Sequence, residues 1–251
     1  MRVSTVPITS MRQFMQDVGR QLAALNSLQL PEESLHAVRL IQLQRLARRI
    51  EAVIPGHFGH GERTAHYALL LAAHLKLTKA QQCDLHYAAL LHDIGLLTLS
   101  KNLTSTAGPL TMNDYALVQS HPREGAALLY SYAFLRESAR LIAHHHERWD
   151  GAGYPHGLRG EYIPLSARIL AIADSFDTIA TRSIALHTAV RTLRAAAGSQ
   201  FDPTLSATFS ELLRHQDRRQ PWPLTETTIV DSNTEPPSIV PAPSHRSLPM
   251  F

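Results

Sequence analysis

The chain has little cysteine and no long apolar run, and each shortage excludes a class of protein. Its 251 residues include one cysteine, Cys83, which excludes an intrachain disulfide framework and a cysteine-based zinc cluster. Any metal must therefore be held by nitrogen and oxygen, which favours iron, manganese or another borderline-hard ion over structural zinc. No run approaches the ~18 apolar residues that a membrane span needs.

A targeting segment and a strong charge imbalance are also lacking. The sequence from Met1 onward shows no charged stretch followed by an apolar core, so we expect a soluble, cytoplasmic protein with no membrane partner. Lysine and arginine total 24 against 21 acidic residues, a formal net charge of +3, and the basic residues are dispersed. This pattern predicts no nucleic-acid polymer as a partner, although a modest positive charge suits an anionic phosphate substrate.

Apolar residues recur at three- and four-residue spacing along most of the chain, which is typical of amphipathic helices. No segment shows a convincing strand pattern, so the sequence predicts an all-α fold. Pro122 falls inside one expected helix and demands either an early position or a kink. The expected helices cover about residues 9–28, 32–54, 59–75, 78–92, 111–130, 133–147, 166–174, 186–197 and 203–215.

The organisation that we expect is a helical bundle between two flanking segments. Residues 1–56 form a helical N-terminal segment, which could also mediate a homodimer, and residues 57–216 form the main domain. After Arg219 the composition shifts to proline, serine and threonine, which bury too little apolar surface to order a chain. Residues 217–251 are therefore predicted to be a disordered tail.

Histidine is abundant, with fifteen residues, and several lie beside acids at the expected helix ends. His92-Asp93 closes one helix, His145-His146 closes another, and Asp174 is the lone acid in a buried helix. Ligands from several helices that face one interior would build a polynuclear metal site. Adjacent ligands such as His92 and Asp93 point in diverging directions, so they can bind different ions while a carboxylate bridges them.

The order and spacing of these residues resemble the HD superfamily of metal-dependent phosphohydrolases, and more narrowly its HD-GYP branch. The resemblance covers roughly residues 57–216. The matching motifs are His60-Gly61-Glu62-Arg63, Leu91-His92-Asp93-Ile94-Gly95, His121-Pro122-Arg123-Glu124-Gly125, His145-His146-Glu147-Arg148-Trp149-Asp150-Gly151-Ala152-Gly153-Tyr154-Pro155 and Gln200-Phe201-Asp202-Pro203.

The resemblance implies a cyclic di-GMP phosphodiesterase with two divalent ions, iron or manganese, and an attacking hydroxide that bridges them. Asp93 would bridge the ions and serve as the catalytic residue. The loop of Gly153, Tyr154 and Pro155 would help to form the substrate cleft. The implied metal ligands are His60, His92, Asp93, His121, His145, His146 and Asp174.

Several positions depart from the family pattern. Family members that bind a third metal carry a glutamate where this chain has Gly56, so we expect two metals. Lysines that contact phosphate are replaced by Leu96 and by the segment 106–108, which begins with Thr106. Two arginines are replaced by Ser183 and Leu186. We therefore expect a reduced phosphate clamp, in which the neighbouring Arg182 is a candidate substrate-binding residue.

These departures leave two alternatives open. The chain could be a degenerate HD-GYP regulator or scaffold that binds metal and partner proteins without turnover, docking GGDEF-domain proteins through the Gly-Tyr-Pro loop. It could also be an HD phosphohydrolase of another nucleotide. His57 and His144, each close in sequence to an expected ligand, are either hydrogen-bond partners of the ligands or bystanders.

Overall fold

The computed structural model describes residues 8–54, 56–99, 112–182 and 186–217. Within these ranges the backbone forms helices and turns, with one isolated bridge between Ala197 and Phe201, so the all-α prediction is confirmed. The helices, in chain order, are α1 (Ile8–Asn26), α2 (Glu32–Glu51), α3 (His60–His74), α4 (Lys79–Leu91), η1 (Ile94–Thr98), α6 (Met112–Val118), α7 (His121–Tyr130), η2 (Ala133–Leu135), α8 (Arg136–Ala143), η3 (Gly160–Tyr162), α9 (Leu165–Arg182), α10 (Leu186–Ala195) and α11 (Pro203–Asp217).

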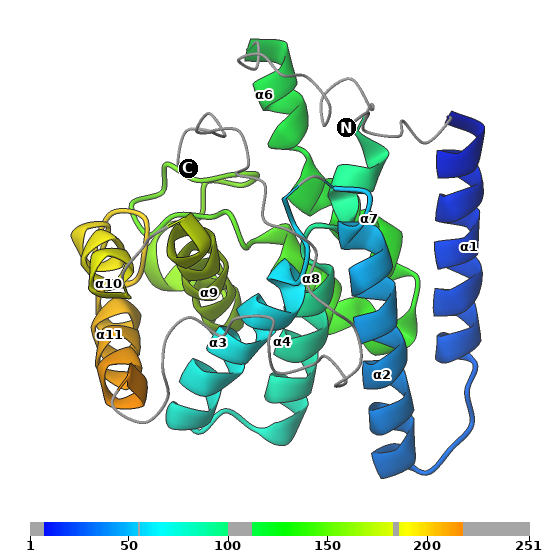
Figure 1. Cartoon of the computed structure of the whole chain (residues 1–251), viewed down its shortest axis with the longest axis horizontal. Coiled ribbons are helices and arrows are strands. Elements are labelled where there is room, and N and C mark those ends of the chain that lie inside the picture. Colours follow the sequence, from blue (N-terminus) through cyan, green and yellow to red (C-terminus); the bar gives the residue numbers. More distant parts are fainter. Residues whose placement is uncertain (1–7, 55, 100–111, 183–185, 218–251) are drawn as a thin grey trace, which may run out of the picture.

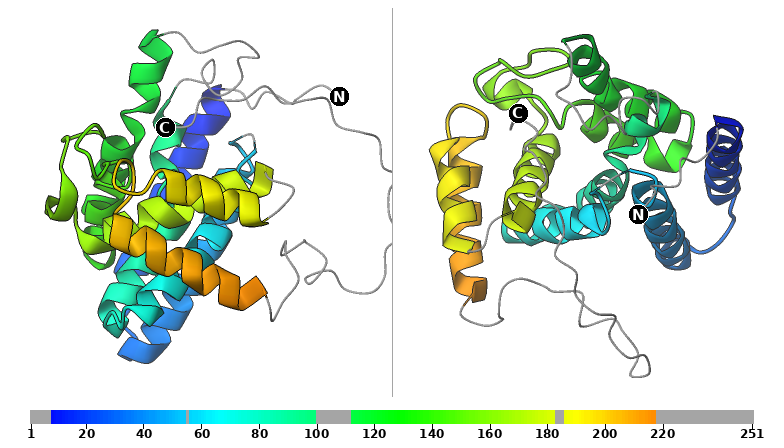
Figure 2. Two further views of the ribbon diagram at one scale, coloured as in Figure 1. Left: turned by 90° about the vertical axis from the view of Figure 1, so that its left-hand side faces the viewer. Right: turned by 45° about the horizontal axis from the view of Figure 1, so that its top comes forward.

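The bundle is built around contacts of α3 with α4 and α9, and of α8 with α4 and α7 (Figure 1). Helices α10 and α11 lie beside α9, whereas α1 lies at the opposite side of the molecule beside α2 (Figure 2). This packing brings together the N-terminal ends of α3 and α7 and the C-terminal ends of α4 and α8. The expected ligands lie at these ends, and α9 passes alongside.

Helix α9 is longer than expected and is buried along most of its length. Ile169, Leu170, Ile172 and Phe176 are fully buried, because the helix packs against α3, α4 and α10. The acids on α9 therefore lie in the core, where they need partners.

The expected helix over 111–130 consists of two helices. Helix α6 ends at Val118 and α7 begins at His121, with Pro122 in the first turn of α7. A proline is tolerated there because the first helical N–H groups have no intrahelical partner. The sequence allowed either an early helical position or a kink at Pro122, and the early position is confirmed.

Helix α8 ends at Ala143, four residues before the expected end. His145 to Glu147 lie instead in the turn that follows. The His145 ring donates a hydrogen bond to the Ile142 carbonyl at 2.7 Å, in place of the regular helical pairing at this point. The turn presents His145 and His146 from the end of the helix.

The first two helices share the apolar core with the rest of the bundle. Val18, Leu22 and Leu25 of α1 belong to one buried cluster with Leu43 and the residues of the later helices. The division at residue 56 remains a prediction, and the expected tail lies outside the described residues apart from Asp217. None of the helices described has the length and apolarity to cross a membrane.

Candidate metal centre

Two groups of three side chains form the centre. His60, His92 and Asp174 place one ligand atom each within 4.8 Å of one another. His121, His145 and His146 form the second triad by the same measure. The structure therefore brings together six of the seven expected ligands as two triads.

Asp93, the seventh expected ligand, lies between the triads. Its Oδ2 atom is 3.3 Å from His92 Nε2 and 3.9 Å from His60 Nε2. Its Oδ1 atom is 3.5 Å from His121 Nε2. One carboxylate oxygen thus faces each triad, which is the arrangement that a bridging ligand requires.

Three of the imidazoles form hydrogen bonds to the backbone through the ring nitrogen that faces away from the centre. The Nδ1 atoms of His92, His121 and His145 donate to the carbonyl oxygen three residues earlier, at 2.9, 2.7 and 2.7 Å. Such contacts fix the tautomer and the ring orientation of a metal-binding histidine. They leave each Nε2 atom with its lone pair directed into the centre.

His60 is held by a carboxylate instead. Its Nδ1 atom donates to Asp177 Oδ2 at 2.8 Å, and Arg63 holds the same carboxylate with two hydrogen bonds of 2.7 and 3.1 Å. Neither Asp177 nor Arg63 was predicted from the sequence. The available signal was that Asp177 lies three residues after Asp174, on the same side of a buried helix.

The start of α3 is fixed by Glu51, a second acid that the sequence did not single out. Its two carboxylate oxygens accept hydrogen bonds from the backbone N–H groups of Gly59 and Gly61, each at 2.7 Å. Gly59 has φ of +72°, a left-handed conformation that glycine adopts without strain. These contacts set the position of His60, which lies between the two glycines.

The Nε2 atoms of the second triad are arranged to bind a cation. His121 Nε2 and His145 Nε2 lie 3.3 Å apart, and both rings already carry their proton on Nδ1. Burial lowers the pKa of both side chains, so both are neutral and two lone pairs face each other. A positive ion between the two nitrogen atoms removes this repulsion, and neutral imidazole is the form that binds divalent metals.

The carboxylates keep their charge despite burial. Burial alone would raise the pKa of Asp93, but the nearby His92 and His57 hold it well below its ordinary value. Burial alone would lower the pKa of His60, but Asp174 and Asp177 hold it well above its ordinary value. The carboxylates therefore favour positive charge at this point, whether a proton or a metal ion supplies it.

The Gly153-Tyr154-Pro155 loop lies against the second triad. The Tyr154 ring centre is 5.0 Å from that of His146, and the Tyr154 N–H donates to the His146 carbonyl at 3.2 Å. Glu147 supports the same loop, because its carboxylate accepts the backbone N–H groups of His156 and Leu158 at 2.8 and 2.9 Å. The loop thus borders the centre, and its part in a substrate cleft remains a prediction.

The expected clamp residues contribute little charge in the part of the chain that the structure describes. Leu96 and Leu186 pack against the apolar core. Thr106, Ser183 and the side chain of Arg182 lie outside the described residues.

Among the described residues, the ion pairs of Asp93 and Asp174 are formed with histidines, including His57, whose Nε2 atom lies 3.4 Å from Asp93. His57 therefore borders the centre.

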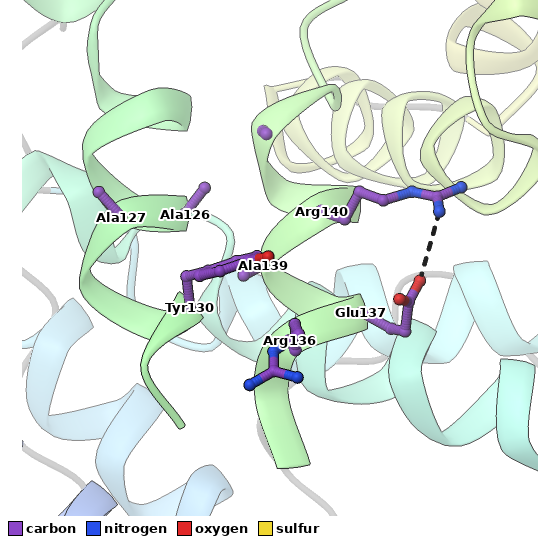
Figure 3. Close-up of a pocket in the computed structure, with 8 residues that line it drawn as sticks. Ala126, Ala127, Tyr130, Arg136, Glu137, Ala139 and Arg140 are labelled. Carbon is purple, nitrogen blue, oxygen red and sulfur yellow. Dashed lines mark ion pairs between the residues drawn. The ribbon is translucent and has the colours of Figure 1, made fainter. Parts of the chain in front are cut away.

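A hollow of about 330 Å³ lies elsewhere, between the end of α7 and α8 (Figure 3). Alanine side chains, Tyr130 and the ion-paired Glu137 and Arg140 line it. None of the seven expected ligands lines this hollow, so its size does not make it the site of the chemistry.

Comparisons with known proteins agree with this geometry. Residues 44–205 match the HD domain family. The cyclic di-GMP phosphodiesterase response regulator RpfG of Xanthomonas campestris is 36% identical over 191 residues, which are 73% of this chain and 49% of that protein. The 3'3'-cGAMP-specific phosphodiesterase 3 of Vibrio cholerae is 38% identical over 130 residues, or 52% of this chain and 28% of that protein.

A solved structure shows the same fold. The cyclic GMP-AMP-specific phosphodiesterase of V. cholerae superposes with a TM-score of 0.58 at 24% identity, over 70% of this chain and 49% of that one. The chain spans about half of RpfG and a smaller part of the cGAMP-specific relative. Because the family match covers more than half of its residues, the protein belongs to the HD domain family, and its motifs fit the HD-GYP branch.

Proposed function

We propose that the protein is a metal-dependent phosphodiesterase that hydrolyses cyclic di-GMP. The observation that carries the proposal is the position of Asp93, with one carboxylate oxygen toward each of two triads. Two ions that share a carboxylate can contact both the attacking and the leaving oxygen of a phosphodiester. The RpfG relative, named as a cyclic di-GMP phosphodiesterase, supports the same reaction class.

The proposed ligands of the two ions are the seven residues of the centre, and the proposed ions are iron or manganese. Imidazole and carboxylate donors suit these ions, and the described residues of the centre include no thiolate. When bound, the ions supply Lewis acidity and an acidified water as the nucleophile. The histidine contacts to backbone carbonyls and to Asp177 hold the ligands in place before any ion binds.

The surroundings of the centre suit a dinucleotide bound with a reduced clamp. Tyr154 offers an aromatic ring beside His146, and His57 offers a polar group beside Asp93. Leu96 is apolar and packs against the core, so it offers no charged contact to a phosphate. If each lost charge-assisted contact is worth ~1.5–3 kcal/mol, substrate affinity falls by about tenfold or more per contact.

The test is a hydrolysis assay with the anaerobically purified, manganese-loaded protein. We expect a linear or fully cleaved product from cyclic di-GMP, and a loss of at least ~100-fold in kcat for Asp93→Asn, because the bridging carboxylate is weakened. Asp84→Asn is the matched control, since Asp84 is a half-buried aspartate of α4 whose pKa is raised by burial. Its rate should stay within about twofold of the wild type, as expected for a site away from the chemistry.

The same assay distinguishes the substrates. Relatives specific for 3'3'-cGAMP make that dinucleotide the natural competitor. A kcat/KM higher for cyclic GMP-AMP than for cyclic di-GMP would move the assignment to another nucleotide while leaving the reaction class intact.

A non-catalytic regulator is the second candidate, favoured by the apolar side chain of Leu96, which packs against the core and offers no charge to a phosphate. It predicts bound metal without turnover of either dinucleotide, together with binding of a GGDEF-domain protein at the Gly-Tyr-Pro loop. A homodimer through the N-terminal helices remains a separate prediction.

A further inference from the structure

A third cluster of metal-binding side chains lies outside the seven proposed ligands. His144 follows α8, Glu147 lies in the next turn, and His156 comes directly after the Gly-Tyr-Pro loop. Each offers one ligand atom, and these atoms lie within 4.8 Å of one another. Glu147 Oε1 is 3.8 Å from His144 Nδ1 and 3.6 Å from His156 Nδ1.

His144 provides an independent sign that a ligand belongs here. Its Nδ1 atom is buried and has no hydrogen-bond partner within the described ranges. The Nδ1 atoms of His92, His121 and His145 each donate to a carbonyl oxygen. A buried polar atom without a partner costs about 1–3 kcal/mol. His144 therefore differs from these three histidines, and its Nδ1 atom faces the Glu147 carboxylate.

Glu147 provides a second sign that a cation binds here. Its side chain is fully buried, and in the described part of the chain its ion pairs are with His144 and His156 rather than with arginine or lysine. Each oxygen accepts one backbone N–H, from His156 and from Leu158. A carboxylate oxygen has a second lone pair, so the hydrogen bonds leave one free for a cation.

The spacing suits a small ion. Ligand atoms at ~2.0–2.1 Å from a tetrahedral zinc ion lie ~3.4 Å apart. The separations of 3.6 and 3.8 Å from Glu147 Oε1 to the two histidine nitrogens require shifts of a few tenths of an ångström. The two histidine atoms lie within 4.8 Å of each other, so they approach further when an ion binds. The His156 side chain is 55% exposed, so its ring can make this adjustment and solvent can fill the fourth position.

We propose that His144, Glu147 and His156 bind one additional divalent ion of the zinc type, separate from the two-ion centre. Two imidazoles and one carboxylate are a ligand set that zinc accepts with an open fourth position. The ion ties the end of α8 to the residue after Pro155. It thereby restrains the Gly153-Tyr154-Pro155 loop, which lies beside His146, and makes zinc a regulator of access to the centre.

The first test counts zinc in the full chain after dialysis against zinc chloride at micromolar concentration. His156→Ala removes an exposed ligand, and His187→Ala removes an exposed histidine of α10 as the matched control. Both variants keep all seven residues of the two-ion centre, so metal bound there cancels in the comparison. We expect His156→Ala to bind one zinc per chain fewer than the wild type, and His187→Ala to bind the same amount.

The second test measures amide hydrogen exchange over residues 153–158 with and without zinc. Zinc should slow exchange in the wild type and in His187→Ala, and should have no effect in His156→Ala or His144→Ala. Equal zinc content in the wild type and His156→Ala would overturn the proposal, as would zinc protection that persists in both ligand variants. Neither readout depends on phosphodiesterase activity, so a failed hydrolysis assay would not be mistaken for the absence of this site.

Discussion

At the scale of single residues, the proposed metal centre depends on the hydrogen bonds that orient its ligands as much as on the ligands themselves. His92, His121 and His145 are fixed by backbone carbonyls, which no substitution of a side chain removes. His60 differs, because its contact is the Asp177 carboxylate, which Arg63 also holds. A side-chain substitution can therefore test the role of such contacts at His60.

Asp177→Asn should weaken manganese binding by about 10- to 100-fold, because it removes the charge that orients the His60 ring. Competition with a chelator measures this affinity. Asp202→Asn is the matched control, since Asp202 is also buried and paired with an arginine, Arg168, at 2.6 Å. Equal losses of affinity in the two variants would show a general effect of instability and would contradict the positioning role of Asp177.

His86 predicts a pH dependence of stability away from the centre. Burial, with a smaller effect of His36, lowers its pKa to about 4. In the unfolded chain the His86 side chain has a pKa of ~6.5. Between about pH 4 and pH 6.5 the unfolded chain therefore binds more protons than the folded chain, so the free energy of unfolding decreases as the pH falls through this range. At pH 5 the loss in the free energy of unfolding is about 1–2 kcal/mol.

Urea unfolding at pH 7.5 and pH 5 checks this difference. His86→Gln does not titrate, so it should lose about 1–2 kcal/mol less than the wild type between the two pH values. Identical pH dependence in the two proteins would show that the His86 side chain is not buried as a neutral group.

The residues that the structure gathers at the proposed centre could be named from the sequence, because their types, order and spacing resemble a family pattern. The contacts that orient them could not, since they depend on tertiary packing. Asp177 is 117 positions from His60, and Glu51 reaches the backbone of Gly61 from the preceding helix. Local patterns hold no information about such pairs.

At the scale of elements, the separation of η1 and α7 sets the distance between the Asp93 and His121 side chains. A Cβ atom added at Gly95 would overlap the His121 carbonyl and lie 2.7 Å from the Gly125 nitrogen. The two elements are therefore packed backbone to backbone. Sequence periodicity predicted a helix over the region of α7, but it predicted neither η1 nor this contact, because a missing side chain leaves no apolar pattern.

Gly95→Ala should destabilise the protein by about 2 kcal/mol or more, because η1 and α7 must move apart. The same movement should weaken metal binding. Gly19→Ala is the control in α1, where the nearest atom to the new Cβ is 3.7 Å away, and it should stabilise by about 0.5–1 kcal/mol. Thermal unfolding of both variants gives the comparison, and a tolerated Gly95→Ala would contradict the close packing.

At the scale of the whole molecule, α1 shares its core with the helices of the proposed metal centre. The family resemblance begins at about residue 57, which predicts a separate helical segment over residues 1–56. The structure packs Leu22, which is 2% exposed, in the same apolar cluster as the rest. We therefore expect the described helices to unfold as one unit.

Leu22→Ala should cost about 2–4 kcal/mol, because it leaves a cavity in that core. Leu30→Ala, at a leucine that is 44% exposed, should cost less than ~0.5 kcal/mol. Calorimetry of metal-loaded protein should show one transition for each variant. A separate early transition in Leu22→Ala, with the main transition unchanged, would show that α1 is an independent unit.

The two-ion centre is the central claim, and the anaerobic count of iron plus manganese per chain tests it most directly. The seven ligands predict about two ions per wild-type chain, and fewer in Asp93→Asn because the shared ligand is weakened. A wild-type protein that binds neither ion under these conditions would contradict the account.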